Sequence, residues 1–159
     1  MVPVIVTALT EPAADQLTDV AELFDQYRRH HGQPVVAGQT LAWLMDHTSR
    51  MRLAVFTAHI GEDLAGLATT VALPASLRLG CSCSSAICTS CQVPGARRRG
   101  IARALVGAIR QAATAAGAIR LSVQTEPGNI AALQLYRTSG FTQVENLEIL
   151  ALPLQHEAT

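Results

Sequence analysis

The sequence predicts one α/β (α+β) domain over residues 1–159, with elements in the order β-α-α-β-β-β-α-β-α-β. Two features of the chain support this class. Short runs rich in valine and isoleucine read as strands, whereas other runs carry apolar residues at helical spacing. The composition is 49% hydrophobic and 15% charged, so the chain can bury a core and is not disordered.

In the first half of the chain, a strand over residues 2–9 leads into two helices. We expect Thr10 to cap the first helix, with Glu11 and Pro12 in its first turn, because threonine accepts hydrogen bonds at helix starts. This helix is expected to end near His31. The elements that follow are a helix over 39–47 and two strands, over 53–60 and 64–73, joined by a turn over 61–63 and closed at Pro74.

In the second half, a serine-containing loop over 75–85 is expected before a strand over 86–93. A long helix over 97–116 follows, and Gly117 ends it. The buried stripe of this helix is predicted to consist of Ile101, Leu105, Ile109 and Ala112. The last elements are a strand over 119–124, a helix over 127–139 and a strand over 141–152.

The charge of the chain is balanced overall but unevenly placed. Formal net charge is zero, so a nucleic-acid partner is not expected. Residues 11–25 carry five acids and no base, whereas residues 97–110 carry five arginines and no acid. One end of the fold should therefore attract phosphate groups.

No apolar run approaches the roughly 20 residues that span a bilayer. The apolar start of the chain lacks the basic residues and the small-residue cleavage site of a signal peptide. We therefore expect a cytoplasmic protein that does not enter a membrane.

A glycine- and arginine-rich turn precedes the long helix. The motif Arg97-x-x-Gly100-x-Ala102 places small residues where a backbone can approach a ligand closely. Amides at the start of a helix lack helical partners and suit a phosphate or pyrophosphate. Neighbouring arginines add charge-assisted hydrogen bonds. This segment is the predicted anion-binding loop.

The loop motif and a second motif together resemble the GNAT-type N-acetyltransferase superfamily. The second motif is Asn129, followed by Leu135-Tyr136 and then Gly140-Phe141, in the order that this family shows. Each motif alone is common, but both appear here, separated by a helix and a strand. The resemblance implies a mixed, mainly antiparallel sheet of six to seven strands with helices on both faces.

The resemblance also implies an activity. Members of this family transfer an acetyl group from acetyl-CoA to an amine, by direct attack on the thioester. The acceptor would be a primary amine of a small molecule, or of a peptide or protein. Two alternatives stay open: transfer of a different acyl group, and a module that binds acyl-CoA or a partner without turnover. Most members of the family dimerise, so a homodimer is one expected assembly.

The family pattern implies where acetyl-CoA would bind. The strand before the loop should splay from the strand over 119–124, so that pantetheine pairs with the freed edge as an added strand would. A free amide on that edge could also stabilise negative charge on the reacting carbonyl oxygen. The cofactor-binding residues implied in this way are Cys91, Gln92, Val93, Arg97, Arg98, Arg99, Gly100, Ile101, Ala102, Arg103, Asn129 and Tyr136.

The same pattern places Tyr136 as the general acid. A neutral phenol, with a pKa of about 10, can protonate a departing thiolate, whose thiol has a pKa of about 8.5. As a plain side chain on an amphipathic helix, Tyr136 would instead be part of the core. The general base is less defined, because Glu126, His30, His31 and a water chain are all candidates. Tyr27 and His31 are the expected contacts of the acceptor, since the run from Tyr27 to Pro34 resembles one subgroup of the family.

Four cysteines lie close together, at positions 81, 83, 88 and 91. Their C-x-C and C-x-x-C pairs resemble zinc-binding spacing. Only four residues separate the pairs, however, and the second pair lies in a predicted strand, where residues three apart face opposite sides. We therefore expect free thiols, no bound metal, and no stoichiometric zinc in the purified protein.

Overall fold

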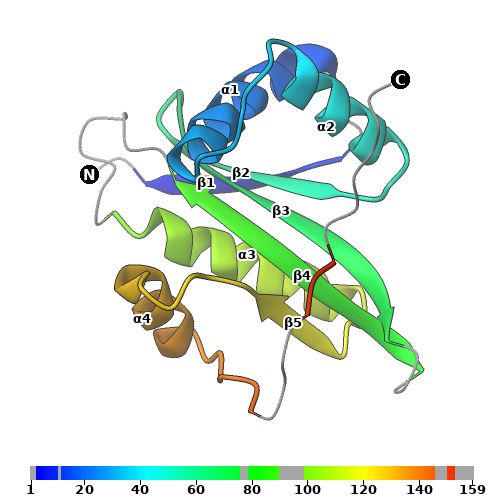
Figure 1. Cartoon of the computed structure of the whole chain (residues 1–159), viewed down its shortest axis with the longest axis vertical. Coiled ribbons are helices and arrows are strands. Elements are labelled where there is room, and N and C mark those ends of the chain that lie inside the picture. Colours follow the sequence, from blue (N-terminus) through cyan, green and yellow to red (C-terminus); the bar gives the residue numbers. More distant parts are fainter. Residues whose placement is uncertain (1–2, 11, 76–78, 90–98, 146–149, 153–159) are drawn as a thin grey trace.

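The computed structural model describes residues 3–10, 12–75, 79–89, 99–145 and 150–152. In this part of the chain a central sheet lies between helices (Figure 1). The order of the elements is β1-α1-α2-β2-β3-β4-α3-β5-α4. This order agrees with the predicted one up to the last helix.

Five strands form the sheet in the described residues. They are β1 (Val4–Leu9), β2 (Ala54–Ile60), β3 (Asp63–Ala75), β4 (Gly80–Thr89) and β5 (Arg120–Val123), and they lie side by side in that order. The first three pairings are antiparallel, and the pairing of β4 with β5 is parallel. The sheet is therefore mixed and mainly antiparallel, as the sequence led us to expect.

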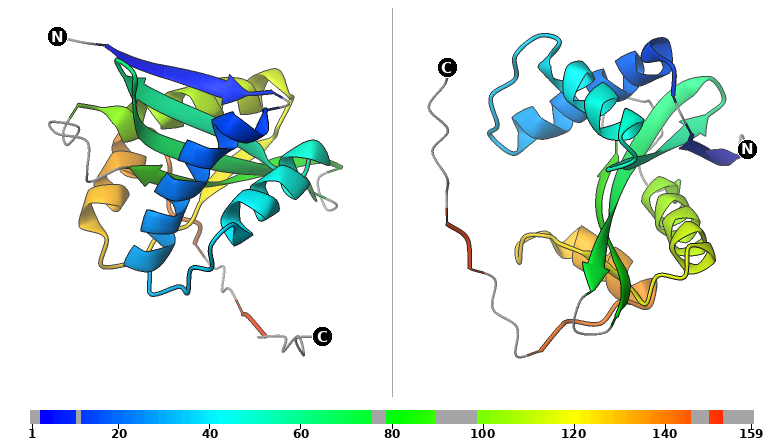
Figure 2. Two further views of the ribbon diagram at one scale, coloured as in Figure 1. Left: turned by 90° about the horizontal axis from the view of Figure 1, so that it is seen from above. Right: turned by 90° about the vertical axis from the view of Figure 1, so that its right-hand side faces the viewer.

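Helices cover both faces of the sheet (Figure 2). Helices α1 (Ala14–His30) and α2 (Gln39–Ser49) lie on one face, where their apolar side chains pack on Leu53, Val55 and Leu67. Helix α3 (Ile101–Ala115) lies on the other face, against a second core cluster that includes Phe56, Ala58 and Ala68. Because successive strand residues point to opposite faces, β2 supplies both clusters.

The start of the first helix differs from the prediction. Helix α1 begins at Ala14, so Thr10 does not cap it, and Pro12 precedes the helix. Pro12 disfavours helical backbone at the residue before it, which stops the helix from extending back to Thr10. The N–H of Ala13 instead donates to Gln16 Oε1 at 3.2 Å.

The region predicted as a loop over 75–85 is largely strand. β3 continues through Pro74 to Ala75, and β4 begins at Gly80, with Pro74 opposite Cys81. The pairing of β3 with β2 ends at Thr70, so Pro74 lies on an edge, where its missing N–H breaks no ladder. Serines of β4 bond across the hairpin: the hydroxyls of Ser85 and Thr70 lie 2.6 Å apart.

The predicted last strand over 141–152 is not found in the residues described there. Residues 141–145 and 150–152 form no strand, and residues 146–149 lie outside the described part. The sheet therefore has five described strands where six to seven were expected. Helix α4 (Ile130–Thr138) and α3 are also shorter than predicted at their starts. No helix among the described residues is long and apolar enough to cross a membrane.

Candidate active site

The parallel pair β4 and β5 parts partway along β4. Ser82 to Ser85 pair with Arg120 to Val123, and β5 then ends while β4 continues to Thr89. Along the last residues of β4, after Ser85, the strand edge that faces β5 therefore lacks that partner. A freed strand edge of this kind can accept an extended ligand by backbone hydrogen bonds. The predicted splaying of the strand over 86–93 from the strand over 119–124 extends past Thr89 into residues outside the described part, so it stays a prediction.

Helix α3 begins next in the chain, at a glycine in the left-handed conformation. Gly100 has φ +78°, which a right-handed helix does not accept, so the predicted start at Arg97 is wrong and the helix begins at Ile101. Its first hydrogen bond runs from Ala104 N–H to Gly100 O at 2.8 Å. No side chain caps the helix and no acid lies in its first turn, so its leading amides suit an anion.

Several predicted loop residues cannot be placed. Cys91, Gln92, Val93, Arg97 and Arg98 lie outside the described residues. Of the remaining loop residues, Ile101 is buried and anchors the helix, whereas Gly100 and Arg103 are exposed.

Helix α4 lies beside the first turn of α3. Arg103 Nη2 donates to Thr138 Oγ1 at 3.1 Å, which ties the two helices together. Asn129 caps α4, because its side chain accepts a hydrogen bond from Ala132 N–H at 3.1 Å. Tyr136 is the buried residue of α4, and its ring packs at 5.6 Å from the ring of Phe141. The second motif therefore forms a helix that contacts the first turn of α3 through Thr138, with its tyrosine packed against Phe141.

His31 and Glu126 come together, although 95 positions separate them in the sequence. His31 Nδ1 and Glu126 Oε1 lie 3.4 Å apart, and the His31 side chain is 32% exposed while that of Glu126 is 75% exposed. His31 ends α1, and Glu126 lies in the segment between β5 and α4. Two of the predicted base candidates thus form one pair, next to the point where β5 ends. His30 packs edge-on to His31, at 5.3 Å between ring centroids.

A cavity of about 340 Å³ lies between α1 and α2. It contains Tyr27 and His31, the two residues predicted to contact the acceptor. The rest of its lining was not predicted from the sequence, although the aromatic residues at 24, 27 and 43 could have indicated a ligand-binding cavity. The other lining residues are Phe24, Arg28, Gln33, Gln39, Thr40 and Trp43.

Two polar side chains on the wall of this cavity, Arg28 and Thr40, already have hydrogen-bond partners. Arg28 donates to Thr40 Oγ1 and to Pro34 O, both at 2.9 Å, and it lies 3.7 Å from Asp25 Oδ1. Thr40 in turn donates to Asp25 at 2.5 Å. This cluster joins α1 to α2 and fixes the shape of the cavity.

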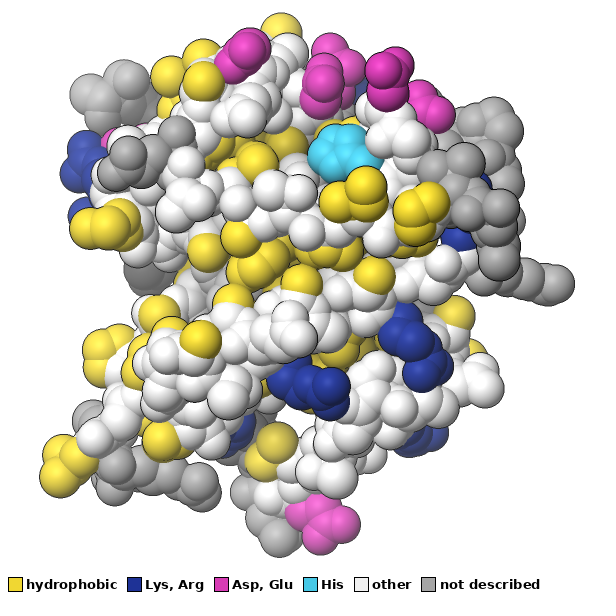
Figure 3. Space-filling model, turned by 180° about the vertical axis from the view of Figure 1, so that it is seen from behind, with side chains coloured by type: hydrophobic (Ala, Val, Ile, Leu, Met, Phe, Trp, Pro, Cys, Tyr) yellow, Lys and Arg dark blue, Asp and Glu magenta, His cyan; other side chains and the backbone are white. Residues whose placement is uncertain are grey.

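The uneven charge of the sequence is visible on the surface. Figure 3 shows most of the visible acidic side chains gathered at the top of the molecule and several basic side chains over the lower half, with others at the upper edges. Arg99 and Arg103 belong to the arginine-rich end that contains the start of α3. A phosphate group is therefore attracted to the end where the leading amides lie.

Two cysteines of β4, Cys81 and Cys83, are free thiols. Cys81 is half-buried and Cys83 is buried. In the described residues, no group of three or more His, Cys, Asp or Glu side chains could hold a metal ion. Cys91 and the side chain of Cys88 lie outside that part, so the expected absence of zinc stays a prediction.

Burial raises the pKa of the Cys83 thiol, and the neighbouring Cys81 raises it further. The thiolate is the reactive form, so a higher pKa leaves less of it at a given pH. We expect iodoacetamide to label Cys83 more slowly than Cys81 in the folded protein, as followed by peptide mass spectrometry. In denaturant the two rates should become equal. Equal rates in the folded protein would contradict the burial of Cys83.

Comparison with known proteins identifies the family of this chain. The model of the acetyltransferase (GNAT) family matches residues 17–141. This range includes both motifs and most of the chain. The chain belongs to the GNAT family of acetyltransferases. No curated protein sequence matches it.

Solved structures of acetyltransferases have the same fold. One, described as a probable acetyltransferase, is 24% identical, with a TM-score of 0.84 over 96% of this chain and 99% of that one. An aminoglycoside acetyltransferase from an uncultured soil metagenomic sample, in complex with sisomicin, is 18% identical (TM-score 0.78; 96% and 97% covered). A ribosomal-protein-alanine N-acetyltransferase from Brucella melitensis biovar Abortus 2308 is 14% identical (TM-score 0.73; 96% and 99% covered). At these identities the likeness shows the fold, and the substrates belong to those proteins.

Proposed function

We propose that this protein transfers the acetyl group of acetyl-CoA to a primary amine. The observation that carries the proposal is that β4 continues beyond the end of β5 and that the next helix in the chain, α3, begins without a side-chain cap. The residues present fit acetyl-CoA, since a free strand edge suits the amide groups of pantetheine and helix amides with arginines suit the pyrophosphate. Acetyl-CoA would supply the activated acetyl group as a thioester.

The residues that would hold acetyl-CoA follow from this placement. Gly100, Ile101, Ala102 and Arg103 would contribute the start of α3, and Arg99 would add positive charge. Cys91, Gln92 and Val93, which continue the β4 segment, are proposed to bind pantetheine by their backbone groups. Arg97 and Arg98 are proposed to extend the phosphate contact. Asn129, at the start of α4, completes the proposed set.

Proton transfers are assigned to two places. The amine nitrogen forms a bond to the carbonyl carbon while the carbon–sulfur bond breaks, so the amine loses a proton and the thiolate gains one. We assign the first proton to the pair formed by His31 and Glu126, directly or through water. We assign the second to the hydroxyl of Tyr136 as general acid. The pair is formed by the end of α1 and the segment after β5, whereas the tyrosine lies on α4.

Two measurements on the purified protein test this function. Calorimetry should show acetyl-CoA binding, and incubation with acetyl-CoA and a panel of primary amines should release CoA and yield the N-acetylated amine by mass spectrometry. Binding without product from any amine would favour the module that binds acyl-CoA without turnover. Absence of acetyl-CoA binding in a folded protein would refute both. The same assay with longer acyl-CoA thioesters tests the alternative acyl group.

A further inference from the structure

The described lining of the cavity between α1 and α2 consists of four rings and four polar side chains, and none of these is an acid. Phe24, Tyr27 and Trp43 contribute aromatic faces, and the imidazole of His31 continues them at 4.4 Å from the Tyr27 ring. No carboxylate occurs among its described lining residues. Aromatic faces attract apolar groups and cations, whereas a polyhydroxylated, multiply charged ligand needs several polar partners. The lining therefore favours an apolar body.

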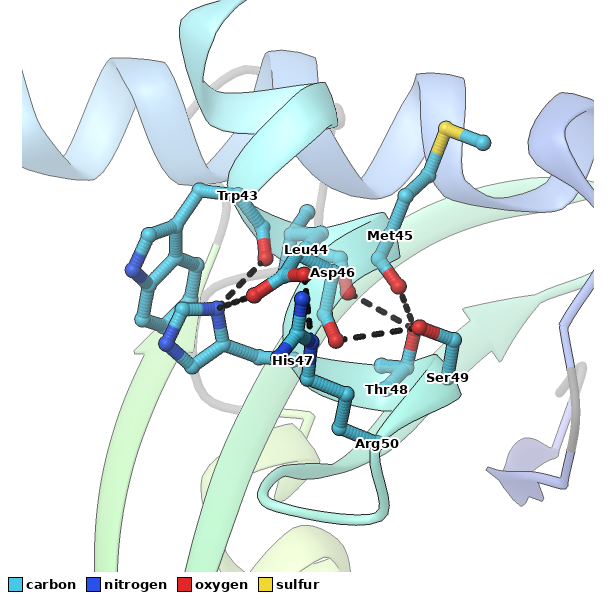
Figure 4. A network of polar contacts seen from close by, with 8 residues as sticks. All are labelled: Trp43, Leu44, Met45, Asp46, His47, Thr48, Ser49 and Arg50. Carbon is cyan, nitrogen blue, oxygen red and sulfur yellow. Dashed lines mark hydrogen bonds and ion pairs between the residues drawn. The ribbon is translucent and has the colours of Figure 1, made fainter.

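The ring of Trp43 packs against another side chain of the same helix, His47. The two rings stack, with centroids 4.4 Å apart and planes 26° apart, and His47 Nδ1 lies 2.9 Å from the carbonyl oxygen of Trp43 (Figure 4). Trp43 is nevertheless 42% exposed, which is high for so large an apolar side chain. Met45 points away from Trp43 on the other side of α2 (Figure 4). A fixed, exposed ring at a cavity is suited to stacking on a ligand.

Arg28 is the one arginine or lysine of the described lining, and its charge already has an acidic partner. Arg28 lies near Asp25 and donates hydrogen bonds to Thr40 and Pro34, so its charge and two of its donors have partners. A substrate carboxylate would meet a guanidinium whose charge is already countered by Asp25, so it would gain less than at an unpaired arginine. An amino acid with a free carboxylate is therefore a poor fit to the cavity.

A negative group stands at one end of the cavity. His31 lines the cavity and pairs with Glu126, which lies outside it on the segment after β5. An ammonium group can approach Glu126 while its hydrocarbon body remains among the rings. Glu126 lies three residues after the end of β5, so this end of the cavity adjoins the segment that follows β5.

We propose that the acceptor is a primary amine with an aromatic or alicyclic body and no carboxylate, an arylalkylamine or a close analogue. The body stacks among Phe24, Tyr27 and Trp43, and the amine lies at the pair of His31 and Glu126. This proposal rests on the proposed function, whose acceptor it specifies. It separates the protein from enzymes that acetylate amino sugars, since the cavity offers no set of carboxylates for several ammonium groups.

Intrinsic fluorescence tests the binding without any turnover. Trp43 is the single tryptophan of the chain, so its emission reports on this cavity alone. At fixed pH, 2-phenylethylamine should change the emission saturably, and 2-phenylethanol, which lacks the ammonium, should bind at least about ten-fold more weakly. Phenylalanine and sisomicin should bind more weakly still. In the acetylation assay the same order should appear in kcat/KM.

Two variants connect the signal to the assigned residues. Glu126→Gln removes an exposed charge and should weaken 2-phenylethylamine several-fold while leaving 2-phenylethanol unchanged, a difference that a packing effect would not produce. Tyr27→Leu should weaken both ligands by about ten-fold through loss of an aromatic face. Met45→Leu, on the same helix but facing away from Trp43, is the matched control and should change neither.

Failure of this proposal is distinguishable from failure of the proposed function. If the protein binds acetyl-CoA and acetylates sisomicin or phenylalanine faster than 2-phenylethylamine, the acceptor class is wrong and the acetyltransfer stands. Equal affinity for 2-phenylethylamine and 2-phenylethanol would overturn the role of Glu126. If acetyl-CoA does not bind, the proposed function fails first, and a fluorescence change would then mark a binding site without transfer.

Discussion

Tyr136→Phe is expected to lower turnover of acetyl-CoA by about 10²–10⁴-fold, with little change in acetyl-CoA affinity. The substitution keeps the ring, its packing against Phe141 and the helix, and removes only the hydroxyl. If that hydroxyl protonates the departing thiolate, its loss raises the barrier of that step alone. Steady-state rates with a saturating acceptor, together with calorimetry for acetyl-CoA, measure the two quantities.

A thioester with a more acidic thiol separates catalysis from packing. A good leaving group needs no proton, so the rate lost in Tyr136→Phe should largely return when acetyl-CoA is replaced by such a thioester. Thermal unfolding should confirm that the variant is folded, since Tyr136 is buried. If the variant turns over acetyl-CoA within about two-fold of the wild type, the tyrosine belongs to the core and water is the proton source.

The order of the elements up to the last helix was predictable, because it depends on local patterns. The apolar stripe of α3 was read from its spacing, and Ile101, Leu105 and Ile109 are indeed buried. Ala112, the fourth member of that stripe, is exposed, and Ala113 is buried in its place. The predicted ends of strands were wrong where pairing with another strand determines them. Pro74 was taken as a strand end, yet it lies in an edge pairing with β4.

The serines of β4 are a second case in which pairing between strands overrides the local sequence pattern. Gly80 and a run of small polar residues predict a loop when read alone. In the fold, Ser82 Oγ donates to Leu73 O at 3.3 Å and Ser85 meets Thr70, so the hairpin supplies the partners that a strand needs. Only the pairing with β3, which is set by tertiary structure, makes this segment a strand.

The candidate site was predictable in its motifs but not in its geometry. The motifs predicted Asn129, Tyr136 and Gly100; in the structure Gly100 precedes α3, Asn129 caps the start of α4, and Tyr136 lies near the end of α4. The sequence analysis also named Glu126 and His31 separately, and no sequence pattern showed that they pair. The cavity depends on how α1 and α2 lie together, which is fixed by bonds such as Arg28 to Thr40. Such contacts between helices leave no periodic signal in the chain.

Gly100→Asp is expected to weaken acetyl-CoA binding at least ten-fold, which is about 1.4 kcal/mol or more. A carboxylate at this position would lie beside the leading amides of α3, where the pyrophosphate is proposed to bind, and like charges repel. A Cβ at this position meets no atom of the described residues within 4 Å, so they leave room for it. Aspartate also tolerates a positive φ better than most residues and is a favourable helix cap, which preserves the fold.

Two matched variants isolate the charge. Gly100→Asn has nearly the same shape and the same tolerance of the left-handed conformation, so it should lose clearly less affinity than Gly100→Asp. Gly117→Asp places the same acid in a similar conformation, φ +69°, beyond the other end of α3, again with nothing within 4 Å, and should leave affinity unchanged. The gap between Gly100→Asp and Gly100→Asn should shrink as salt is added, because exposed charges are screened. Equal affinities for wild type and Gly100→Asp, measured by calorimetry on folded proteins, would remove the start of α3 from the acetyl-CoA site.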